Sequence, residues 1–288
     1  MTKHVAVITG AGSGIGQALA QKFCSEGYRL GLCDIHDDNL NETVRNLGCD
    51  PHDVFSAKVD VSSKEEMVAF ADEIQKKFGQ VDVVVNNAGI SICATFETTK
   101  DDDFKRLMGI NFWGVVHGSR VFLPHLKARP AATIINISSI FGVVGAVTNS
   151  AYCASKFAVL GFSDCLREEL RGAGVHVLTV APGAIDTAIA KNSVIGDTTG
   201  LLPKGVAPAD AFKYVARVSP SKAAKAIIRA SQKKKDRLLI GLDAYGLYFG
   251  TKIFGFRLSH AYFRLGSWLL GKKESKSSKR KGEALPGA

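Results

Sequence analysis

A tyrosine and a lysine stand four residues apart in the segment Tyr152-Cys153-Ala154-Ser155-Lys156. Residues with this spacing share one face of a helix, so a helical segment would project Tyr152 and Lys156 together. An ammonium beside a phenol favours the phenolate, and we expect it to lower the pKa of Tyr152 from about 10 toward neutral pH. Tyr152 could then act as a base on an alcohol or as an acid on a carbonyl. Such a pair also occurs on solvated helix faces, so the surrounding residues must decide.

A serine and an asparagine upstream of this pair are further candidates. Ser139 ends an apolar run and stands thirteen residues before Tyr152, where its hydroxyl could hold and polarise the oxygen of a substrate. Asn111 is flanked by apolar residues, and a buried amide needs partners, which a water-linked proton path to Lys156 would supply. An asparagine that bonds its own backbone is an almost equally good interpretation of Asn111.

A glycine-rich turn, Thr9-Gly10-Ala11-Gly12-Ser13-Gly14-Ile15-Gly16, follows the first apolar run of the chain. Glycines let backbone N–H groups approach a pyrophosphate, and the N-terminus of the helix that follows adds partial positive charge. Ordinary tight turns also use glycine, but a strand before and a helix after favour a dinucleotide site. The residues expected to contact the cofactor here are Gly10, Ser13, Gly14, Ile15 and Gly16.

An aspartate, Asp34, closes the second apolar run, eighteen residues beyond Gly16. Its carboxylate could accept hydrogen bonds from both hydroxyls of an adenosine ribose, and it would repel a 2′-phosphate. No Lys or Arg follows directly, because Ile35–Asp37 come next. Both observations favour NAD over NADP. A helix N-cap is the alternative role, which the aspartates that follow fit better.

Small or amide side chains close the third and fourth apolar runs. They would suit a narrow slot for adenine, with hydrogen bonds from the backbone. Turn chemistry explains each of them equally well when they are taken singly. The residues predicted to lie on the adenine side are Asp60, Val61, Asn87, Ala88 and Gly89.

Short apolar runs alternate with segments of helical periodicity along the chain. Runs that are apolar throughout suit strands buried on both faces of a parallel sheet. The alternation predicts an α/β fold, a single doubly wound sheet with helices on both faces, whose ligands bind beyond the carboxyl ends of the strands. The predicted strands are Val5–Thr9, Leu30–Asp34, Val54–Val59, Val81–Asn86, Thr133–Ser138, Val175–Val180 and Arg237–Ile240, and the predicted helices are Gly14–Glu26, Asp38–Leu47, Lys64–Phe78, Asp101–Leu126, Tyr152–Arg171 and Pro220–Lys234.

The chain resembles the classical short-chain dehydrogenases/reductases over roughly residues 3–240. The resemblance rests on T-G-x-x-x-G-I-G, N-N-A-G, a strand-end serine, Y-x-x-x-K and a Pro-Gly pair, in the family's order and spacing. It implies a Rossmann-type sheet of strand order 3-2-1-4-5-6-7, a dimer or tetramer, and Lys156 bound to the nicotinamide ribose. The family spacing selects Ser139 over Ser138. The implied catalytic tetrad is Asn111, Ser139, Tyr152 and Lys156, and the implied nicotinamide contacts include Pro182, Gly183, Ile185 and Thr187.

Residues 184–212 lack clear periodicity and contain several glycines and prolines. An irregular surface loop is one interpretation, but the resembling family commonly places its substrate loop here, so we favour a mobile lid. This loop would belong to a catalytic domain spanning residues 1–241. Apolar residues in the loop, together with Phe141, Val143 and Val144, suggest a lipophilic substrate.

Positive charge is concentrated toward the C-terminus. Residues 1–212 hold 19 Lys and Arg against 23 Asp and Glu, whereas residues 213–288 hold 18 against 4. Residues 242–271 combine an apolar, aromatic stripe with a basic face, which is typical of a helix in a membrane interface. The basic tail 272–288, predicted to be disordered, would be drawn to anionic headgroups. Packing on its own domain or across a dimer, and nonspecific attraction of nucleic acid, are the alternatives, and no specific nucleic-acid partner is expected.

The six cysteines show neither a C-x-x-C pair nor metal-ligand spacing with histidine, so we expect free thiols in a reducing compartment and no metal site. No leader and no long uncharged apolar stretch occur. A cytoplasmic protein, with peripheral membrane contact as an addition, is the expectation.

The leading hypothesis is therefore an NAD-dependent oxidoreductase that interconverts a lipophilic secondary alcohol and its carbonyl compound. Steroid, retinoid, long-chain and terpenoid alcohols are the candidate substrate classes. One alternative is a dinucleotide-sensing protein docked on a membrane, which would need only the cofactor half of the motifs. Another is an NADPH-dependent acyl-carrier ketoreductase, which Asp34 opposes.

Overall fold

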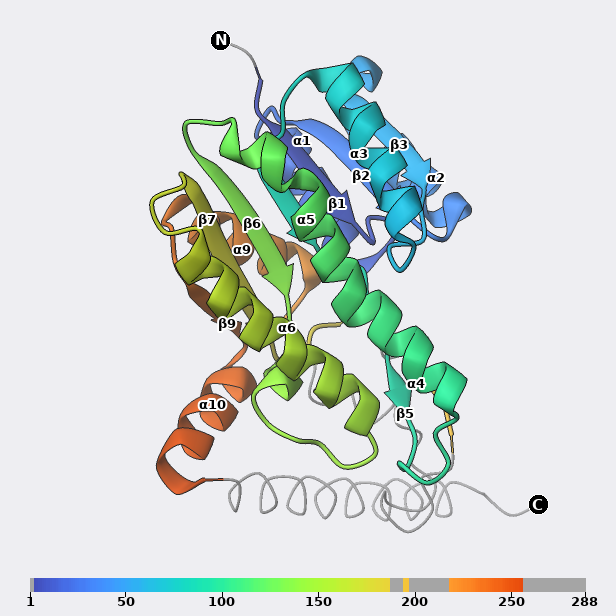
Figure 1. Ribbon diagram of the computed structural model, residues 1–288, viewed down its shortest axis with the longest axis vertical. Helices are drawn as coiled ribbons and strands as arrows, with labels where there is room; N and C mark the ends of the chain where they lie inside the picture. The colour runs from blue at the N-terminus through green and yellow to red at the C-terminus, as the bar shows by residue number, and fades with distance from the viewer. Residues whose placement is uncertain (1–2, 187–193, 197–217, 256–288) are drawn as a thin grey trace, which may run out of the picture.

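A seven-stranded parallel sheet forms the centre of the computed structural model, which describes residues 3–186, 194–196 and 218–255 (Figure 1). Its strand order is β3-β2-β1-β4-β6-β7-β9, which is the predicted order 3-2-1-4-5-6-7 when these seven strands are counted along the chain. The order reverses between β1 and β4, which pair with each other at the middle of the sheet. The strands are β1 (Val5–Thr9), β2 (Arg29–Asp34), β3 (Val54–Lys58), β4 (Val83–Asn86), β6 (Ala132–Ile137), β7 (Val175–Pro182) and β9 (Arg237–Ile240).

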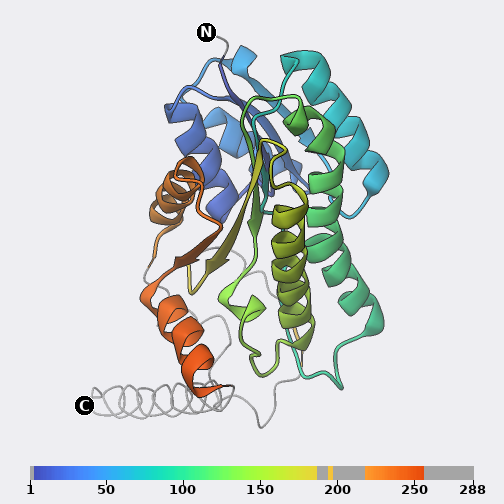
Figure 2. The same ribbon diagram turned by 60° about the vertical axis from the view of Figure 1, so that its left-hand side comes forward.

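Helices cover both faces of the sheet, as Figures 1 and 2 show. One face carries α1 (Gly14–Ser25), α2 (Asp37–Arg45) and α9 (Pro220–Gln232), and the other carries α3 (Lys64–Phe78), α5 (Gly114–Lys127) and α6 (Ser150–Glu169). Every residue of β1 is buried, because alternate side chains point into the two apolar cores. Ala6 and Ile8 enter the core beneath α1 and α9, while Val5 and Val7 enter the core beneath α3 and α5. This burial explains why the strand is apolar throughout.

The helix predicted over Asp101–Leu126 is interrupted. The structure has α4 (Asp101–Met108), then a π-helical turn over Gly109–Trp113, then α5. Such turns are uncommon and occur often at functional sites. Periodicity did not predict the interruption because one extra residue in a turn changes the spacing of apolar side chains only slightly.

A two-stranded ribbon outside the main sheet was also not predicted. It joins β5 (Ile92–Cys93) to β8 (Val194–Ile195) in parallel. Each strand has two residues, too few for a visible alternation of apolar and polar side chains. The ribbon connects the segment after β4 to the stretch predicted as a substrate loop, of which residues 187–193 and 197–212 lie outside the described part.

The chain continues after β9 into α10 (Leu242–Phe254). Gly241 precedes this helix with a φ of +101°, a conformation that glycine adopts without strain. The helix lies beyond the carboxyl ends of β6, β7 and β9, at the lower end of the molecule in Figure 1. The predicted amphipathic extension 242–271 is thus described only up to residue 255, and the basic tail 272–288 lies outside the described residues.

Candidate active site

The carboxyl ends of four strands bring the predicted motifs to one edge of the sheet. Gly10 follows β1, Asn87 follows β4, Ser139 follows the end of β6, and Pro182 closes β7. Because all seven strands are parallel, these positions lie at the same edge, and the first two flank the reversal of strand order. That edge is where ligands of doubly wound sheets bind.

The glycine-rich turn packs too tightly for side chains. Gly10 and Gly14 have φ values of +65° and +56°. A Cβ on Gly16 would stand 2.0 Å from the carbonyl oxygen of Gly10. Ser13 is the N-cap residue of α1, and its side chain makes no capping hydrogen bond. The first amides of α1 thus have no side-chain acceptor, which leaves them suited to an anionic ligand.

Asn87 connects the end of β4 to this turn. Its Nδ2 donates to the carbonyl oxygens of Thr9 at 3.0 Å and Gly10 at 3.1 Å. The Thr9 hydroxyl in turn accepts from the backbone N–H groups of Asn87 and Ala88. The predicted adenine-side residue Asn87 therefore also holds β1 and β4 together at the cofactor edge.

Asp34 lies half-buried at the end of β2, beside the glycine turn. One carboxylate oxygen accepts from the backbone N–H of Gly12 at 2.8 Å, and the other accepts from that of His36 at 3.0 Å. The N-cap residue of α2 is His36, so Asp34 does not cap that helix itself. Each oxygen retains a further lone pair that could accept from a ribose hydroxyl.

Asp60 uses its side chain for a turn. Its Oδ1 accepts from the backbone N–H and the hydroxyl of Ser62, at 2.9 and 2.7 Å. The hydrogen bonds of the Asp60 carboxylate are therefore those of a turn, which was the alternative interpretation. A contact between Asp60 and adenine stays a prediction. Val61, the next residue, is buried and would be 2.8 Å from a Cβ on Gly114.

The candidate catalytic side chains come from α6 and from the end of β6. Tyr152 and Lys156 are both buried on α6, and the hydroxyl of Ser139 shares a hydrogen bond with the Tyr152 phenol. Lys156 Nζ lies 5.8 Å from the centre of the Tyr152 ring and donates to the carbonyl oxygen of Ile137 at 3.0 Å. Ser138 instead donates to the carbonyl oxygen of Lys156 at 2.8 Å. The structure thus places Ser139, and not Ser138, against the phenol.

Asn111 is fully buried in the π-helical turn. Its Oδ1 accepts from the backbone N–H of Ile90 at 2.8 Å, and its Nδ2 donates to the Ile90 carbonyl and to the Ser155 hydroxyl. These bonds reach another segment of the chain, so Asn111 does not bond its own backbone. A Cβ on Gly89 would lie 3.2 Å from Asn111 Oδ1 and 3.4 Å from Lys156 Nζ. The Asn111 amide and the Lys156 ammonium therefore both lie beside Gly89.

The expected lowering of the Tyr152 pKa by Lys156 is wrong for the protein described here. Burial raises the pKa of Tyr152 to about 12, against a smaller opposing effect of the hydrogen bond with Ser139. Burial also lowers the pKa of Lys156 to about 8. Removal from water disfavours the charged form of each group, and it is the largest cause of both shifts.

The end of β7 is held by a residue that sequence reasoning missed. Asp243, in the first turn of α10, accepts from the backbone N–H of Ala184 at 2.7 Å. A Cβ on Gly183 would meet the same carboxylate, so a side chain at this position would displace Asp243 from the turn after Pro182. Ile185 is buried and pairs with Val218. Thr187, the last predicted nicotinamide contact, lies outside the described residues.

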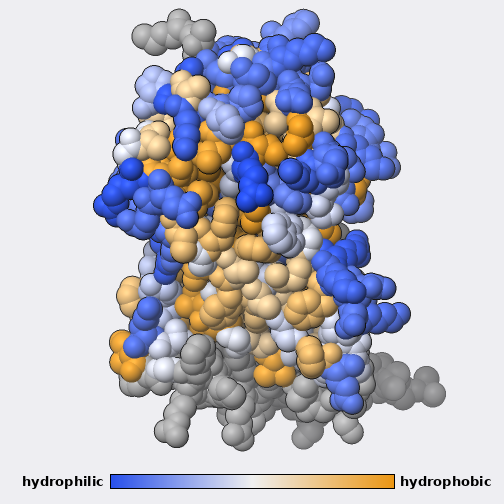
Figure 3. Space-filling view, viewed as in Figure 1, coloured by the Kyte–Doolittle hydropathy of each residue, from blue (hydrophilic) through white to orange (hydrophobic). Residues whose placement is uncertain are grey.

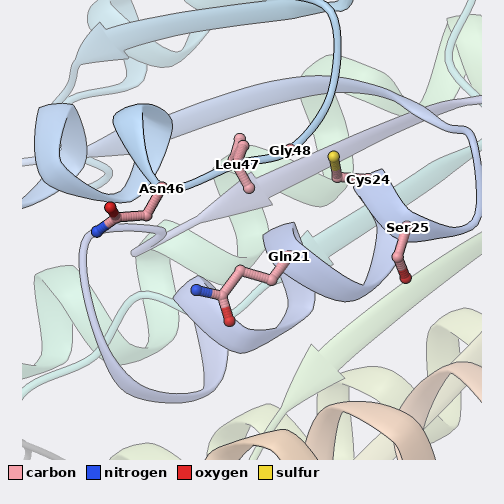
Figure 4. Close-up of a pocket in the computed structure, with 6 residues that line it drawn as sticks. All are labelled: Gln21, Cys24, Ser25, Asn46, Leu47 and Gly48. Atoms are coloured by element: carbon pink, nitrogen blue, oxygen red, sulfur yellow. The ribbon is translucent and has the colours of Figure 1, made fainter.

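A pocket of about 340 Å³ lies elsewhere, beside α1 and the segment after α2 (Figure 4). It adjoins the last turn of α1, whereas the glycine-rich turn is at the first turn of that helix. The lining offers no pair of groups suited to acid–base chemistry, so we do not place the reaction there. The residues that line it are Gln21, Cys24, Ser25, Asn46, Leu47 and Gly48.

Metal sites and membrane-spanning helices are both absent from residues 3–186, 194–196 and 218–255. Within these ranges no cluster of three or more His, Cys, Asp or Glu side chains is arranged to hold a metal ion. No helix in the same ranges combines the length and the apolar character that crossing a bilayer requires.

Comparison with known proteins identifies the family. The sequence family described as short chain dehydrogenase matches residues 4–197. The putative oxidoreductase SadH of Mycobacterium tuberculosis is 40% identical over 254 residues, which are 87% of this chain and 91% of that protein. This chain is a short-chain dehydrogenase/reductase. It is therefore an oxidoreductase by family.

Solved members of the family share the fold. A short-chain dehydrogenase/reductase from Burkholderia phymatum in complex with NAD has a TM-score of 0.76 and 29% identity, covering 92% of this chain and 95% of that one. An alcohol dehydrogenase from Thermococcus sibiricus complexed with 5-hydroxy-NADP has a TM-score of 0.68 and 27% identity, covering 83% and 96%. The two similar structures thus hold different nicotinamide dinucleotides.

Proposed function

We propose that this oxidoreductase interconverts an alcohol and its carbonyl compound with NAD, using Tyr152 as the general acid and base. The observation that carries the proposal is the buried hydrogen-bonded pair of Ser139 and Tyr152 with Lys156 one helical turn away. A protein that only senses a dinucleotide would have no need of this group.

The edge of the sheet fits a dinucleotide. The turn from Gly10 to Gly16 leaves no room for a Cβ at its closest approach, and the uncapped N-terminus of α1 offers backbone N–H groups to a pyrophosphate. Asp34 stands at the end of β2, where it accepts from the Gly12 N–H of this turn and could also accept from a ribose hydroxyl. When bound, the nicotinamide supplies the acceptor or donor of a hydride.

The side chains of the site divide the proton chemistry among them. Ser139 and Tyr152 would hold the substrate oxygen between their hydroxyl groups. In carbonyl reduction Tyr152 donates its proton to that oxygen, and its raised pKa keeps the phenol protonated at neutral pH. In alcohol oxidation Tyr152 must accept the proton, which requires a nearby positive charge. Lys156 supplies one below its pKa of about 8 and would bind the nicotinamide ribose.

Asn111 would pass the proton on between Lys156 and solvent water. It already bonds the backbone of Ile90 and the Ser155 hydroxyl, so it is held in a fixed orientation. Gly89 leaves open the space that Asn111 and Lys156 flank. Because Gly89 has no side chain to separate the two groups, a water molecule beside it would join Asn111 and Lys156.

The preference for NAD rests on Asp34. A carboxylate at this position repels a 2′-phosphate, and Gly12 N–H fixes it against the turn. The similar structures hold NAD in one case and 5-hydroxy-NADP in the other, so the proposal depends on Asp34 and not on them.

A lipophilic substrate is the second part of the proposal. The Phe141 ring lies edge-on to the Tyr152 ring, with 6.4 Å between their centres. Ile92, Ala94 and Leu107 form an apolar cluster that includes Tyr152. Apolar side chains therefore stand next to the phenol that would bind the substrate oxygen. By the family resemblance we further propose a homodimer or homotetramer, which mass measurement by light scattering would test.

The test is a screen of secondary alcohols and ketones followed by the absorbance of NADH. Wild-type protein should turn over at least one lipophilic substrate, and Tyr152→Phe should abolish turnover while NADH binding stays near normal. Turnover retained by purified Tyr152→Phe would end the assignment. A wild-type preference for NADPH would show instead that the role given to Asp34 is wrong.

A further inference from the structure

Four apolar side chains form a stripe along the outer face of α10. Leu242, Tyr245, Phe249 and Ile253 are 88%, 45%, 54% and 71% exposed. Their spacing of three and four residues places them on one side of the helix. The Tyr245 and Phe249 rings stack, with 6.4 Å between their centres. This set, the α10 stripe, is a continuous apolar surface and not a scatter of single residues.

The opposite face of α10 is already packed against the domain. Ala244 and Leu247 are buried in a cluster with Ile140 and Val144, and Tyr248 packs against the same cluster. Ile140 opens the short 3-10 helix η3 (Ile140–Gly142), which directly follows Ser139. The helix is therefore anchored beside the candidate site by the face opposite the α10 stripe, and of the stripe the Phe249 ring lies 5.3 Å from that of Tyr248.

Positive charge accompanies the α10 stripe. Lys252 is exposed in the last turn of the helix. The sequence that continues from it, residues 256–288, holds eight Lys and Arg against two Glu. An exposed apolar stripe joined to a strongly basic sequence is the chemistry of a segment that binds an anionic lipid surface. A second copy of the chain would bring two such basic sequences together, which like charges oppose.

We propose that the α10 stripe docks this protein on an anionic bilayer, with its apolar side chains at the acyl boundary. Figures 1 and 2 place α10 at the end of the molecule reached by the carboxyl ends of β6 and β7. In Figure 3 the same end, at the lower left, carries apolar atoms next to hydrophilic ones. Docking would set the end of the molecule that bears Ser139 and η3 toward the lipid.

Co-sedimentation of the full chain with vesicles tests this proposal. The vesicles are phosphatidylcholine mixed with phosphatidylserine, and pure phosphatidylcholine serves as the uncharged comparison. Wild-type protein should sediment with the mixed vesicles, and high salt should weaken this binding. Phe249→Ser combined with Ile253→Ser should lower the partition coefficient about tenfold or more, because two exposed anchors are lost.

The matched control is Val68→Ser. Val68 is 41% exposed on α3, so the substitution removes an exposed apolar side chain elsewhere, and binding should stay within about twofold. Far-ultraviolet circular dichroism shows whether each variant keeps its fold. Absence of wild-type binding, equal binding to both kinds of vesicle, or equal binding of the double variant would each overturn the proposal. A lower solution mass for the double variant, with vesicle binding intact, would assign the α10 stripe to a second copy instead.

Discussion

The two halves of the candidate site are held by different parts of the polypeptide. On the cofactor side the fit depends mainly on glycines that pack where no Cβ fits, with the Asn87 side chain holding two backbone carbonyls. On the catalytic side it is made by buried side chains, among them Ser139, Tyr152 and Lys156. A single added methyl group should therefore disrupt the cofactor half, whereas the catalytic half can lose its chemistry and keep its shape.

The strongest test of this contrast is Gly16→Ala. The new Cβ would stand 2.0 Å from the Gly10 carbonyl oxygen, so the turn must move. We expect unfolding free energy to fall by about 3 kcal/mol and NADH affinity to fall at least about 100-fold, measured by urea denaturation and fluorescence titration. Gly161→Ala is the control, because a Cβ on Gly161 would meet no heavy atom within 4 Å and alanine favours the helix. Normal NADH binding by Gly16→Ala would contradict the proposed difference between the cofactor half and the catalytic half.

Ser139→Ala should show the opposite behaviour on the catalytic side. Loss of the hydroxyl that pairs with Tyr152 is expected to lower kcat about 100-fold or more, with the dissociation constant of NADH unchanged. Ser138→Ala is the control, because Ser138 donates to the Lys156 carbonyl. It should cost about 1 kcal/mol of stability and leave kcat within about threefold. Similar kcat values for the two variants would contradict the assignment of Ser139.

The burial of Lys156 should appear in the pH dependence of stability. Its pKa of about 8 in the folded protein lies below the ordinary value of 10.5, so between these values the unfolded chain binds more protons. Stability from this group should rise with pH across that window, by up to about 1.4 kcal/mol per pH unit.

Lys156→Met removes this contribution and serves as the comparison. Other buried groups titrate in the same range, so the informative quantity is the difference between wild type and variant. The raised pKa of Tyr152 has the opposite sign, because stability from the phenol is lost as pH rises from 10 toward 12. Urea denaturation of wild type and Lys156→Met at several pH values between 8 and 10 measures the difference in the pH dependence of their stabilities. Parallel curves would show that Lys156 is not desolvated.

Asp34→Ala should change the cofactor half without unfolding it. We expect the preference for NAD over NADP, as a ratio of kcat/KM values, to shrink about tenfold. Asp37→Ala is the control, since Asp37 is exposed in the first turn of α2 and bonds only Asn41 among the hydrogen bonds of its side chain that the described residues show. An unchanged ratio would mean that the adenosine ribose lies elsewhere.

The smallest effect is expected at Asp243, whose side chain supports the turn after Pro182 that is predicted to contact nicotinamide. Asp243→Ala leaves the Ala184 N–H without its acceptor, and KM for NADH should rise about threefold to fivefold while kcat changes little. Asp243→Asn keeps an acceptor oxygen and should behave almost as wild type. A loss confined to kcat would place Asp243 in a different role.

Local features of the sequence predicted most of the fold. β1 matches its predicted bounds because its five residues are nearly all apolar, and α3 matches because its N-cap Ser63 and C-cap Gly79 mark its ends. Tyr152 and Lys156 were placed together by helical spacing alone. Long-range contacts explain the misses: Asp243 contacts Ala184 from 59 residues away, and the pKa of Tyr152 depends on burial, which spacing does not report.

Asn111 shows which features of a residue the sequence predicts and which only the structure shows. Its apolar neighbours predicted burial correctly. Its partner Ile90 stands 21 residues earlier, and the π-helical turn that directs its amide there leaves little trace in periodicity. The residue type was therefore informative, and its orientation required the structure.

The position of β1 in the sheet also affects how the chain folds during its synthesis. β1 pairs with β2 on one side and with β4 on the other, yet β4 begins at Val83, long after β2 ends at Asp34. During synthesis, roughly 50 residues separate the arrival of these two neighbours, which at about 5–20 residues per second is a delay of several seconds. Throughout that interval the emerging chain exposes one edge of a largely apolar strand, the kind of edge through which unfinished proteins aggregate.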